Sequence, residues 1–296
     1  MMYSTPKVVA LGEVLWDEYG GEARLGGAPA NFAVHAAALG AEAHLVSAVG
    51  EDARGHEALR LLAQRGVSTK CITRDPAHRT GRVEVELSAG IPRFRIISDV
   101  AWDHITFQGP MVELAEDADL VYFGTLAQRG EPSRTTLRQF LSLCPAGVLC
   151  VLDLNLREPF YDREVVAESL ARAHLVKLSE EELATLRGYF PGEGDEAAYI
   201  HGLAERFELE LVVVTLGERG CRVHGPEGVL EAAGERIEVV DTVGAGDAFT
   251  AAFALNYLAG HALAECAAAA NAVGAFVAGQ AGATPALPAR FRCTWV

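Results

Sequence analysis

The sequence predicts an α/β fold in which a parallel β-sheet is covered by helices on both faces. Short apolar, β-branched runs recur along the 296 residues, and segments with helical periodicity separate them. The composition, 50% hydrophobic and 22% charged, is typical of a globular protein that buries a large core. Strands that are apolar throughout are buried on both faces, as in parallel sheets.

The strands and helices alternate from the beginning of the chain. We predict strands at 7–13, 44–49, 119–123, 148–153 and 211–215, and amphipathic helices between them at 55–64, 132–143 and 195–207. Right-handed crossovers between parallel strands bring their carboxyl ends to one edge of the sheet, where ligands usually bind. We therefore expect the functional residues at the loops that follow the strands.

Two segments interrupt this alternation. Residues 14–27 follow the first strand without becoming a helix, and residues 80–97 contain two arms of alternating polar and apolar residues, at 82–87 and 93–97. Such alternation predicts paired strands with one covered and one exposed face. We predict one domain over residues 1–296 that carries a small β lid from about 14–27 and 80–97. Its exposed face would close over a ligand or pair with a second subunit in a homodimer.

The net charge of −15 argues against nucleic acid and anionic membranes as partners, since both require a basic surface. The longest uncharged stretch, 266–289, is rich in Ala and Gly and is a poor candidate for a membrane span. No secretory signal is recognised near Met1, and the six cysteines form neither a Cys-x-x-Cys pair nor a zinc-ligand pattern with histidine. We expect reduced thiols and a cytoplasmic location.

The most informative stretch is Asp-Thr-Val-Gly-Ala-Gly-Asp-Ala-Phe at 241–249. Gly244, Ala245 and Gly246 predict a turn, and Asp247 begins an apolar helix that extends to Leu258. The backbone N–H groups of 243–246 would form an anion site at the helix N-terminus. Asp247 is either a helix cap or a general base beside that anion site, and an ordinary aspartate pKa near 4 would leave it ionised at pH 7. The stretch contains neither a Walker A loop nor a Gly-x-Gly-x-x-Gly motif, because Phe249 takes the place of the third glycine.

These residues resemble the C-terminal signature of the ribokinase, or PfkB, family of carbohydrate kinases. Gly-Gly-Ala-Pro-Ala-Asn-Phe-Ala at 26–33, together with Val-Gly-Glu-Asp at 49–52, resembles the N-terminal signature. The two lie in the expected order and far apart, so the resemblance covers nearly the whole chain. It implies a ribokinase-like (Rossmann-like) α/β domain with a β lid, and ATP- and Mg²⁺-dependent phosphorylation of a sugar hydroxyl with Asp247 as the base.

The resemblance also assigns the sugar site. Asn31 lies in the first turn of an apolar helix and would contact sugar hydroxyls, although a local structural role is an alternative. Asp17 aligns with the sugar-binding aspartate of the family and would otherwise be a solvated loop acid. Gly26 and Gly27 allow a hinge between the lid and that helix. In Asp-Leu-Asn-Leu-Arg at 153–157, spacing along a strand would place the polar side chains on one side, with Arg157 close to the transferred phosphate.

The nucleotide site is assigned in the same way. Lys-Leu-Ser-Glu-Glu-Glu at 177–182 stands where the family usually has Asn-x-x-Glu, a motif that positions Mg²⁺ and phosphates, and here serine replaces the asparagine. Glu182 keeps the spacing and would hold Mg²⁺ through water, or it is merely an acidic residue in a first helical turn. Asp241 resembles the K⁺ ligand of those family members that require K⁺. The remaining nucleotide-binding residues implied are Lys177, Ser179, Thr215, Gly217, Gly220, Gly246 and Asn271.

The predicted substrate is fructose. Gly-Gly-Ala-Pro-Ala-Asn at 26–31 resembles the fructokinase branch, whereas ribokinases usually have Lys-Gly in place of Ala-Pro. Asp-x-Asn-x-Arg at 153–157 is shared by fructokinases and 2-keto-3-deoxygluconate kinases. The alternatives are therefore another sugar or sugar-acid kinase, or a non-catalytic regulator that binds sugar or nucleotide. Choice of sugar is expected to depend on lid side chains such as Trp16, Phe94 and Ile96.

Overall fold

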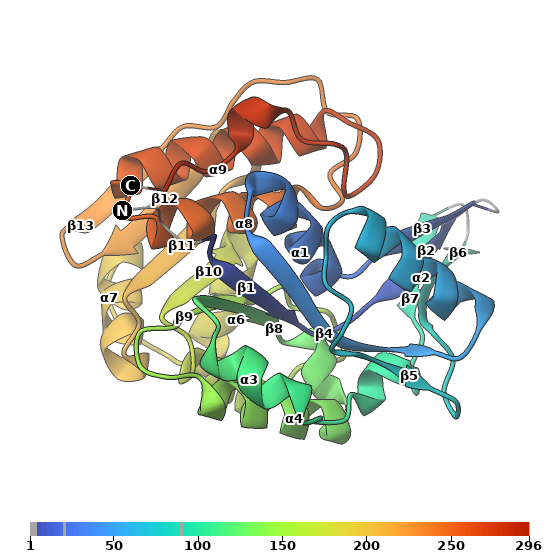
Figure 1. The fold of residues 1–296 in the computed structure, drawn as a ribbon. Helices are drawn as coiled ribbons and strands as arrows, with labels where there is room; N and C mark the ends of the chain where they lie inside the picture. Colours follow the sequence, from blue (N-terminus) through green and yellow to red (C-terminus); the bar gives the residue numbers. More distant parts are fainter. Residues whose placement is uncertain (1–4, 20–21, 89–90, 296) are drawn as a thin grey trace.

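The computed structural model describes residues 5–19, 22–88 and 91–295. Its central feature is a nine-stranded sheet. Seven neighbouring strands run parallel, and the two strands at one edge, which come last in the sequence, are joined by antiparallel pairing. Apolar residues fill the strands inside the sheet because both of its faces are covered (Figure 1). Across the sheet the order is β13 (Gly228–Ala232), β12 (Cys221–Gly225), β11 (Leu211–Thr215), β10 (Leu175–Ser179), β9 (Leu149–Asp153), β8 (Leu120–Gly124), β1 (Lys7–Leu11), β4 (Glu42–Gly50) and β5 (Ile72–Asp75).

Helices cover the two faces of the sheet and form two separate cores. One core includes residues of α1 (Ala28–Leu39), α2 (Ala53–Gln64), α8 (Ala245–Leu258) and α9 (Leu263–Ala278). The other includes residues of α3 (Pro110–Glu116), α4 (Glu131–Leu143), α5 (Arg163–Leu170), α6 (Glu180–Tyr189) and α7 (Glu196–Phe207). Short 3-10 turns occur at Ala101–His104, Leu126–Arg129, Gly217–Arg219 and Ala289–Phe291.

Strand alternation decides which side chains reach each core. Val8 and Ala10 of β1 point to the core of α1 and α8, whereas Val9 and Leu11 point to the opposite core. Asp153 and Thr215 are the last residues of β9 and β11, and Lys177 is the middle residue of β10. Asp153 and Lys177 point to the α8 side. The carboxyl edge of the sheet therefore carries polar groups beneath the N-terminus of α8.

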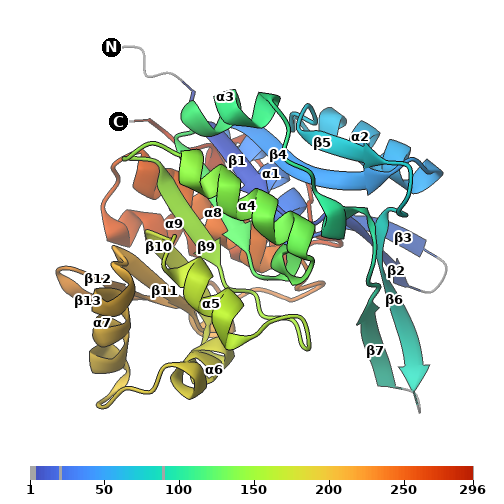
Figure 2. The same ribbon diagram turned by 90° about the horizontal axis from the view of Figure 1, so that it is seen from below.

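A second, four-stranded sheet has the order β3 (Glu22–Gly26), β2 (Leu15–Tyr19), β6 (Gly81–Ser88) and β7 (Ile91–Ile96). Its strands come from the two segments predicted for the lid. Pairing of β2 with β6 is parallel and joins those segments. The β6–β7 hairpin extends away from the rest of the protein (Figure 2).

The predicted fold class is confirmed, and the five predicted strands and three predicted helices are all present. Strand β10 and the antiparallel pair β12–β13 were not predicted. The uncharged stretch 266–289 forms most of α9, the loop that follows it and the first residue of the last 3-10 turn. No helix among the described residues has the length and apolar character needed to cross a membrane. All six cysteines are unpaired, as expected.

Candidate active site

The turn before α8 presents unpaired backbone donors. Gly244 adopts a left-handed conformation with φ of 79° and caps the helix without a side chain. A Cβ atom at this position would overlap the carbonyl group of Ala283, so only glycine fits. Within the described part of the chain, the N–H groups of Gly244, Gly246 and Asp247 have no acceptor. Unpaired donors at the positive end of a helix dipole are an arrangement that can bind an anion.

The predicted set of donors, 243–246, requires correction. The N–H of Val243 donates to Asp241 Oδ1 at 3.1 Å, and the N–H of Ala245 is directed to the carbonyl oxygen of Thr242 at 3.3 Å. Both groups therefore serve the turn itself. The N–H of Asp247 replaces them because the helix begins at Ala245 and leaves its first donors unpaired.

Asp247 is held by a residue from the other end of the chain. Its side chain is 9% exposed, and its Oδ2 accepts a hydrogen bond of 2.8 Å from Nδ2 of Asn31, which lies on α1. Helices α1 and α8 pack together on the same face of the sheet (Figure 1). The helix cap is Gly244, and Asp247 does not cap the helix with its side chain. The carboxylate is thus oriented toward the space between the two helices rather than back to its own backbone.

The pKa of Asp247 is raised to about 7, which corrects the expectation of an ordinary value near 4. Desolvation by burial is the largest cause, and the negative charges of Asp153 and Glu13 add to it. The hydrogen bond from Asn31 and the charge of Lys177 oppose the shift. A carboxylate with this pKa is a stronger base than an exposed aspartate and still titrates close to neutral pH.

Beneath the turn, Lys177 and Asp153 form a buried ion pair. Nζ of Lys177 lies 3.1 Å from Asp153 Oδ1, and Oγ1 of Thr250 donates to Asp153 Oδ2 at 3.2 Å. Burial alone would lower the pKa of Lys177, but Asp153 and Glu182 more than compensate and keep that pKa raised. The positive charge of Lys177 lies beside Gly246, close to the unpaired donors.

The lid reaches this region through its residues next to α1. Burial raises the pKa of Asp17, which the positive charge of Arg157 partly offsets. A Cβ atom at Gly26 would overlap the carboxylate of Asp17, and one at Gly27, where φ is 105°, would overlap the backbone carbonyl of Glu13. Gly27 is therefore required by the backbone contact, whereas a side chain at Gly26 would displace the carboxylate of Asp17. Glu13 is buried, its Oε1 accepts from the N–H of Ala28 at 3.2 Å, and burial raises its pKa to about 6.

The sequence pattern described as the pfkB family carbohydrate kinase matches residues 8–290. The chain belongs to the pfkB family of carbohydrate kinases. It is 34% identical over 239 residues to a sugar kinase of Pyrococcus horikoshii, covering 79% of this chain and 73% of the relative. It is also 30% identical over 314 residues to probable fructokinase-5 of Arabidopsis thaliana, covering 97% and 96% of the two chains.

Solved structures agree with this membership. The Pyrococcus horikoshii sugar kinase in complex with ATP, described as uncharacterized, has a TM-score of 0.80 and 30% identity over 94% of each chain. Fructokinase of Vibrio cholerae, solved with fructose, ADP and calcium, has a TM-score of 0.81 and 26% identity over 97% of each chain. This chain is accordingly an ATP-dependent carbohydrate kinase.

The residues predicted for the Mg²⁺ motif of this pfkB kinase form a helix cap. Ser179 Oγ accepts from the N–H of Glu182 at 3.2 Å, and Glu182 Oε2 accepts from the N–H of Ser179 at 2.8 Å, which makes a capping box at the start of α6. Glu182 Oε1 accepts from the N–H of Leu156 at 2.7 Å. The shorter serine that replaces the usual asparagine thus has a structural partner of its own.

The residues predicted for adenosine gather around the end of β13. Nδ2 of Asn271 donates to the carbonyl oxygens of Ala232 and Ala233, at 3.3 and 3.1 Å. A Cβ atom at Gly220 would overlap the same segment, whereas one at Gly217 would meet nothing. Asn271 and Gly220 therefore shape one loop, and Gly217 leaves open space beside it. Thr215 ends β11, and its Oγ1 donates to the carbonyl oxygen of Leu178 at 3.3 Å.

Asp241 connects the turn before α8 to the loop after α9. Its Oδ1 accepts from Val243, and its Oδ2 accepts from the N–H of Gly282 at 3.1 Å. Arg24 of the lid lies 3.7 Å from the same carboxylate. The carbonyl group of Ala283 lies against Gly244. Asp241, the predicted K⁺ ligand, is therefore adjacent to the loop at 282–283.

One prediction about orientation, that of the polar residues at 153–157, was wrong. The strand β9 ends at Asp153, and Asn155 has a positive φ of 38°, so the polar residues at 153–157 do not share one side. Asp153 is buried, whereas Arg157 is exposed and donates to the carbonyl oxygen of Leu156. Trp16 points away from Asp17, and its Nε1 donates to the carbonyl oxygen of Arg54. Ile96 packs against the second core, and the side chain of Phe94 lies outside the described residues.

Sequence reasoning did not place Glu13 or Thr250 in the site. Glu13 is an acid two residues beyond the buried strand β1, at the carboxyl edge of the sheet. That position was a usable signal, because an acid there must be desolvated and needs a partner. Thr250 gave no signal, since a single threonine in an apolar helix usually bonds to its own backbone.

Proposed function

We propose that this pfkB kinase transfers the γ-phosphoryl group of ATP to a hydroxyl group of fructose. The observation that carries the proposal is the buried carboxylate of Asp247 beside the unpaired N–H groups of Gly244 and Gly246. A base next to an anion site is what phosphoryl transfer to a hydroxyl group requires. The names of the relatives support fructose as the acceptor.

In the proposed reaction, Asp247 accepts the proton of the attacking hydroxyl group. The hydroxyl oxygen forms a bond to the γ-phosphorus, the bond from that phosphorus to the bridging oxygen breaks, and ADP leaves with the electron pair. The N–H groups of Gly244, Gly246 and Asp247 stabilise the charge on the transferring group. Asn31 holds the carboxylate in position, and the positive charge of Lys177 lies just behind the turn.

The sugar is proposed to bind between the lid and α1. Asp17 would accept hydrogen bonds from paired sugar hydroxyls, and Gly26 and Gly27 let the lid backbone approach closely. Arg157 would act on the phosphate or on the acceptor, and it already interacts electrostatically with Asp17. The nucleotide would occupy the region of Thr215, Gly217, Gly220 and Asn271.

Two cation sites belong to the proposal. Glu182 can still contact Mg²⁺ through water, because each of its oxygens has a second lone pair after accepting one N–H group. Mg²⁺ would neutralise part of the charge on the nucleotide phosphates. Asp241, with carbonyl oxygens of 281–283, offers the oxygen donors suited to K⁺, and the carboxylate already contacts that loop.

The pH dependence of the reaction follows from the pKa of Asp247. Because this pKa is raised to about 7, the fraction of ionised base falls as the pH drops through neutrality. We expect kcat/KM to be constant above about pH 8 and to fall about tenfold per pH unit well below pH 7. A profile that stays flat from about pH 5.5 to 8 would contradict the assignment.

The control for this profile is Glu13→Gln. The charge of Glu13 raises the pKa of Asp247, so its removal should move the acid limb to lower pH without abolishing it. Glutamine can still accept the hydrogen bond from the N–H of Ala28. If the limb disappears in this variant, it belongs to Glu13 and not to Asp247.

Substrate choice is tested by measuring ADP release over a panel of sugars with Mg²⁺ and K⁺ present. We expect the highest kcat/KM for fructose, with ribose and 2-keto-3-deoxygluconate as the principal alternatives. Turnover of one of those alternatives in preference to fructose would correct the acceptor and leave the mechanism intact. Absence of turnover on every hexose, pentose and ketodeoxy acid would support a non-catalytic regulator instead.

We also propose a homodimer formed through the lid sheet. Strands β3 and β7 are the edges of this four-stranded sheet, and edges offer unpaired backbone groups to a second chain. Light scattering at micromolar concentration should give twice the chain mass of 31.5 kDa. A single species at the chain mass would refute the dimer.

A further inference from the structure

His35 is fully buried and lies on α1, one turn after Asn31. Residues four apart on a helix share a face, so both side chains leave the same side of α1. Nε2 of His35 lies 3.0 Å from the carbonyl oxygen of Ala283, in the loop after α9. A carbonyl oxygen only accepts hydrogen bonds, so Nε2 is the donor. Helix α1 therefore holds Asp247 through one side chain and the loop after α9 through another.

The ring of His35 makes only this one hydrogen bond. Its Nδ1 has no partner within the described part of the chain. Burial lowers the pKa of His35 to about 4, so the ring is neutral at pH 7. An apolar side chain at this position would avoid the cost of burying an unpaired nitrogen. What the histidine contributes here is therefore its bond to Ala283.

The carbonyl group of Ala283 lies against the turn before α8. A Cβ atom on Gly244 would overlap its oxygen, the same atom that His35 binds. Gly244 carries one of the unpaired N–H groups of the turn. A movement of this oxygen therefore changes the space that is available to Gly244.

The loop at 282–284 is held by side chains from distant parts of the chain. Asp241 accepts from the first N–H group of this loop at 3.1 Å, and Nη1 of Arg65 donates to its last carbonyl oxygen at 2.7 Å. Arg65 is exposed and Asp241 is half-buried, so water competes for both bonds. Ala283 and His35 are both buried. Their bond is therefore the one in this loop that water does not replace.

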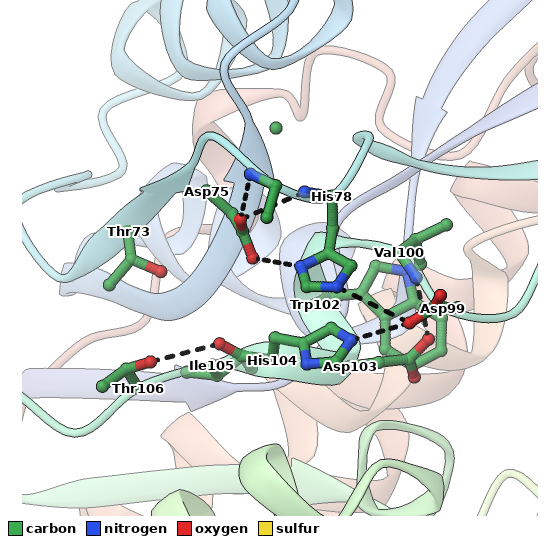
Figure 3. Close-up of polar contacts among 12 residues, drawn as sticks. Thr73, Asp75, His78, Asp99, Val100, Trp102, Asp103, His104, Ile105 and Thr106 are labelled. Atoms are coloured by element: carbon green, nitrogen blue, oxygen red, sulfur yellow. Dashed lines mark hydrogen bonds and ion pairs between the residues drawn. The ribbon is translucent and has the colours of Figure 1, made fainter.

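The histidines at the base of the lid hairpin make bonds of a different kind. Nδ1 of His78 lies 2.7 Å from Asp75 Oδ2, and Nε2 of His104 lies 2.9 Å from Asp99 Oδ1 (Figure 3). The two imidazole side chains are 26% and 30% exposed. Water or a change of rotamer can compensate for a lost bond there. His35 has neither alternative, because its ring is buried and its acceptor belongs to the backbone.

We propose that His35 is a positioning residue for phosphoryl transfer, which acts by holding the carbonyl group of Ala283 against Gly244. The inference rests on the proposed role of this turn as the anion site. With the carbonyl group fixed, the turn keeps the N–H of Gly244 directed at the transferring group. Helix α1 then aligns both parts of the proposed site, because Asn31 orients the carboxylate of Asp247 and His35 holds the turn that provides the anion donors.

The first test is His35→Leu, which removes the donor and keeps a buried side chain of similar size. We expect kcat to fall about 10–100-fold, because a displacement of about 1 Å can cost about 10²-fold in rate. The KM values for ATP and sugar should stay within about twofold of native, since His35 contacts neither substrate in the proposed site. His35→Met also lacks the donor and is used if the leucine variant does not fold.

His35→Gln tests whether the donor is the property that matters. The side-chain amide can still donate to the carbonyl oxygen of Ala283, so kcat should recover to within about threefold of native. Equal losses in the leucine and glutamine variants would attribute the effect to packing and would overturn the proposal.

A double-mutant cycle tests the route through Gly244. Because both changes disturb one turn, His35→Leu should lower kcat by less than about twofold further in a Gly244→Ala background. The acid limb of the pH profile, proposed to belong to Asp247, should keep its position in His35→Leu. Loss of that limb would make His35 the titrating group instead of a positioning residue.

His174→Leu is the matched control. Nδ1 of His174 accepts from the N–H of Cys150 at 3.0 Å, at the amino ends of β9 and β10 and therefore at the opposite edge of the sheet from Asp153. The variant also removes a bond between a histidine and the backbone. We expect its kcat to be unchanged, even where the melting temperature falls.

The kinetics of the single variants distinguish failure of this inference from failure of the proposed function. If Gly244→Ala is impaired but His35→Leu keeps kcat within about twofold of native, the anion site remains and the role of His35 is refuted. Additive losses in the double variant would also refute it, because His35 would then act elsewhere. A native kcat in Gly244→Ala would instead refute the turn as the anion site, and the inference with it.

Discussion

Asp247→Asn is expected to lower kcat roughly 10²–10⁴-fold while ATP still binds. The carboxamide has the shape of the carboxylate and can accept the hydrogen bond from Asn31, but it cannot take up a proton at neutral pH. The N–H groups proposed to hold the phosphates belong to the backbone and remain. Steady-state kinetics and nucleotide titration of the same preparation measure the two effects.

Asp195→Asn provides the matched control for this prediction. Asp195 caps α7 by accepting from the N–H of Ala198 at 2.9 Å, and asparagine caps helices equally well. Turnover should therefore be unchanged in this variant. If Asp247→Asn were also to keep near-native turnover, Asp247 would have only a structural role and the base assignment would fail.

Stability should respond in the opposite direction to activity. The carboxylate of Asp247 is desolvated and close to Asp153 and Glu13, so its charged form is unfavourable in the folded protein. Because its pKa is raised from 3.8 to about 7 on folding, this cost is fully present above about pH 7, decreases as the pH falls below 7, and is absent only below the pKa of the unfolded chain. The melting temperature of Asp247→Asn at pH 8 should thus equal or exceed that of the native protein. Such a result would indicate that the buried carboxylate lowers the stability of the protein while it serves as a base whose pKa is near neutral pH.

Gly244→Ala is expected to reduce kcat about 10²–10³-fold, the effect of losing one anion-stabilising donor. The left-handed conformation costs about 1–2 kcal/mol for a residue with a Cβ atom. In addition, the new methyl group would overlap the Ala283 carbonyl group, so the loop after α9 or the turn must move. Displacement of the turn misdirects the N–H of Gly244 and disturbs the contact between Asp241 and Gly282.

Gly260→Ala isolates the backbone contribution. Gly260 has φ of 83°, close to that of Gly244, but no atom lies near the position of its Cβ. This variant should lose about 1–2 kcal/mol of unfolding free energy and keep its kcat. Equal kinetic effects at the two glycines would attribute the loss at Gly244 to general destabilisation. A kcat for Gly244→Ala within twofold of the native value would exclude the turn as the anion site.

The predicted strands of the main sheet were those with a long apolar run, and those of the lid were predicted from alternation. Strand β10 escaped prediction because Lys177 interrupts its apolar run, although that lysine is buried in an ion pair with Asp153. The ion pair joins residues of two different strands and forms only in the folded protein. The sequence of this segment by itself therefore resembles that of a half-exposed strand. The antiparallel pair β12–β13 escaped prediction because β13 is largely exposed.

The two signature motifs carried more information than periodicity did. They predicted that Asn31 and Asp247 belong to one site, and the structure joins them by a hydrogen bond across 216 residues of sequence. The spacing argument at 153–157 failed, because a strand's alternation ends where the strand ends, here at Asp153. Similarly, Ser179 and Glu182 were assigned from a motif, but the contacts between them are those of a helix cap.

By itself, the sequence determined the fold class, the membership of the pfkB family and the identity of the turn with its aspartate. These conclusions depend on local periodicity and on motifs formed by residues that are consecutive in the sequence. Only the tertiary structure decided which N–H groups are unpaired, that Asn31 orients Asp247, and that the pKa of this carboxylate approaches 7. Those properties arise from burial and from the charges of Glu13, Asp153 and Lys177, which folding brings together from distant parts of the chain.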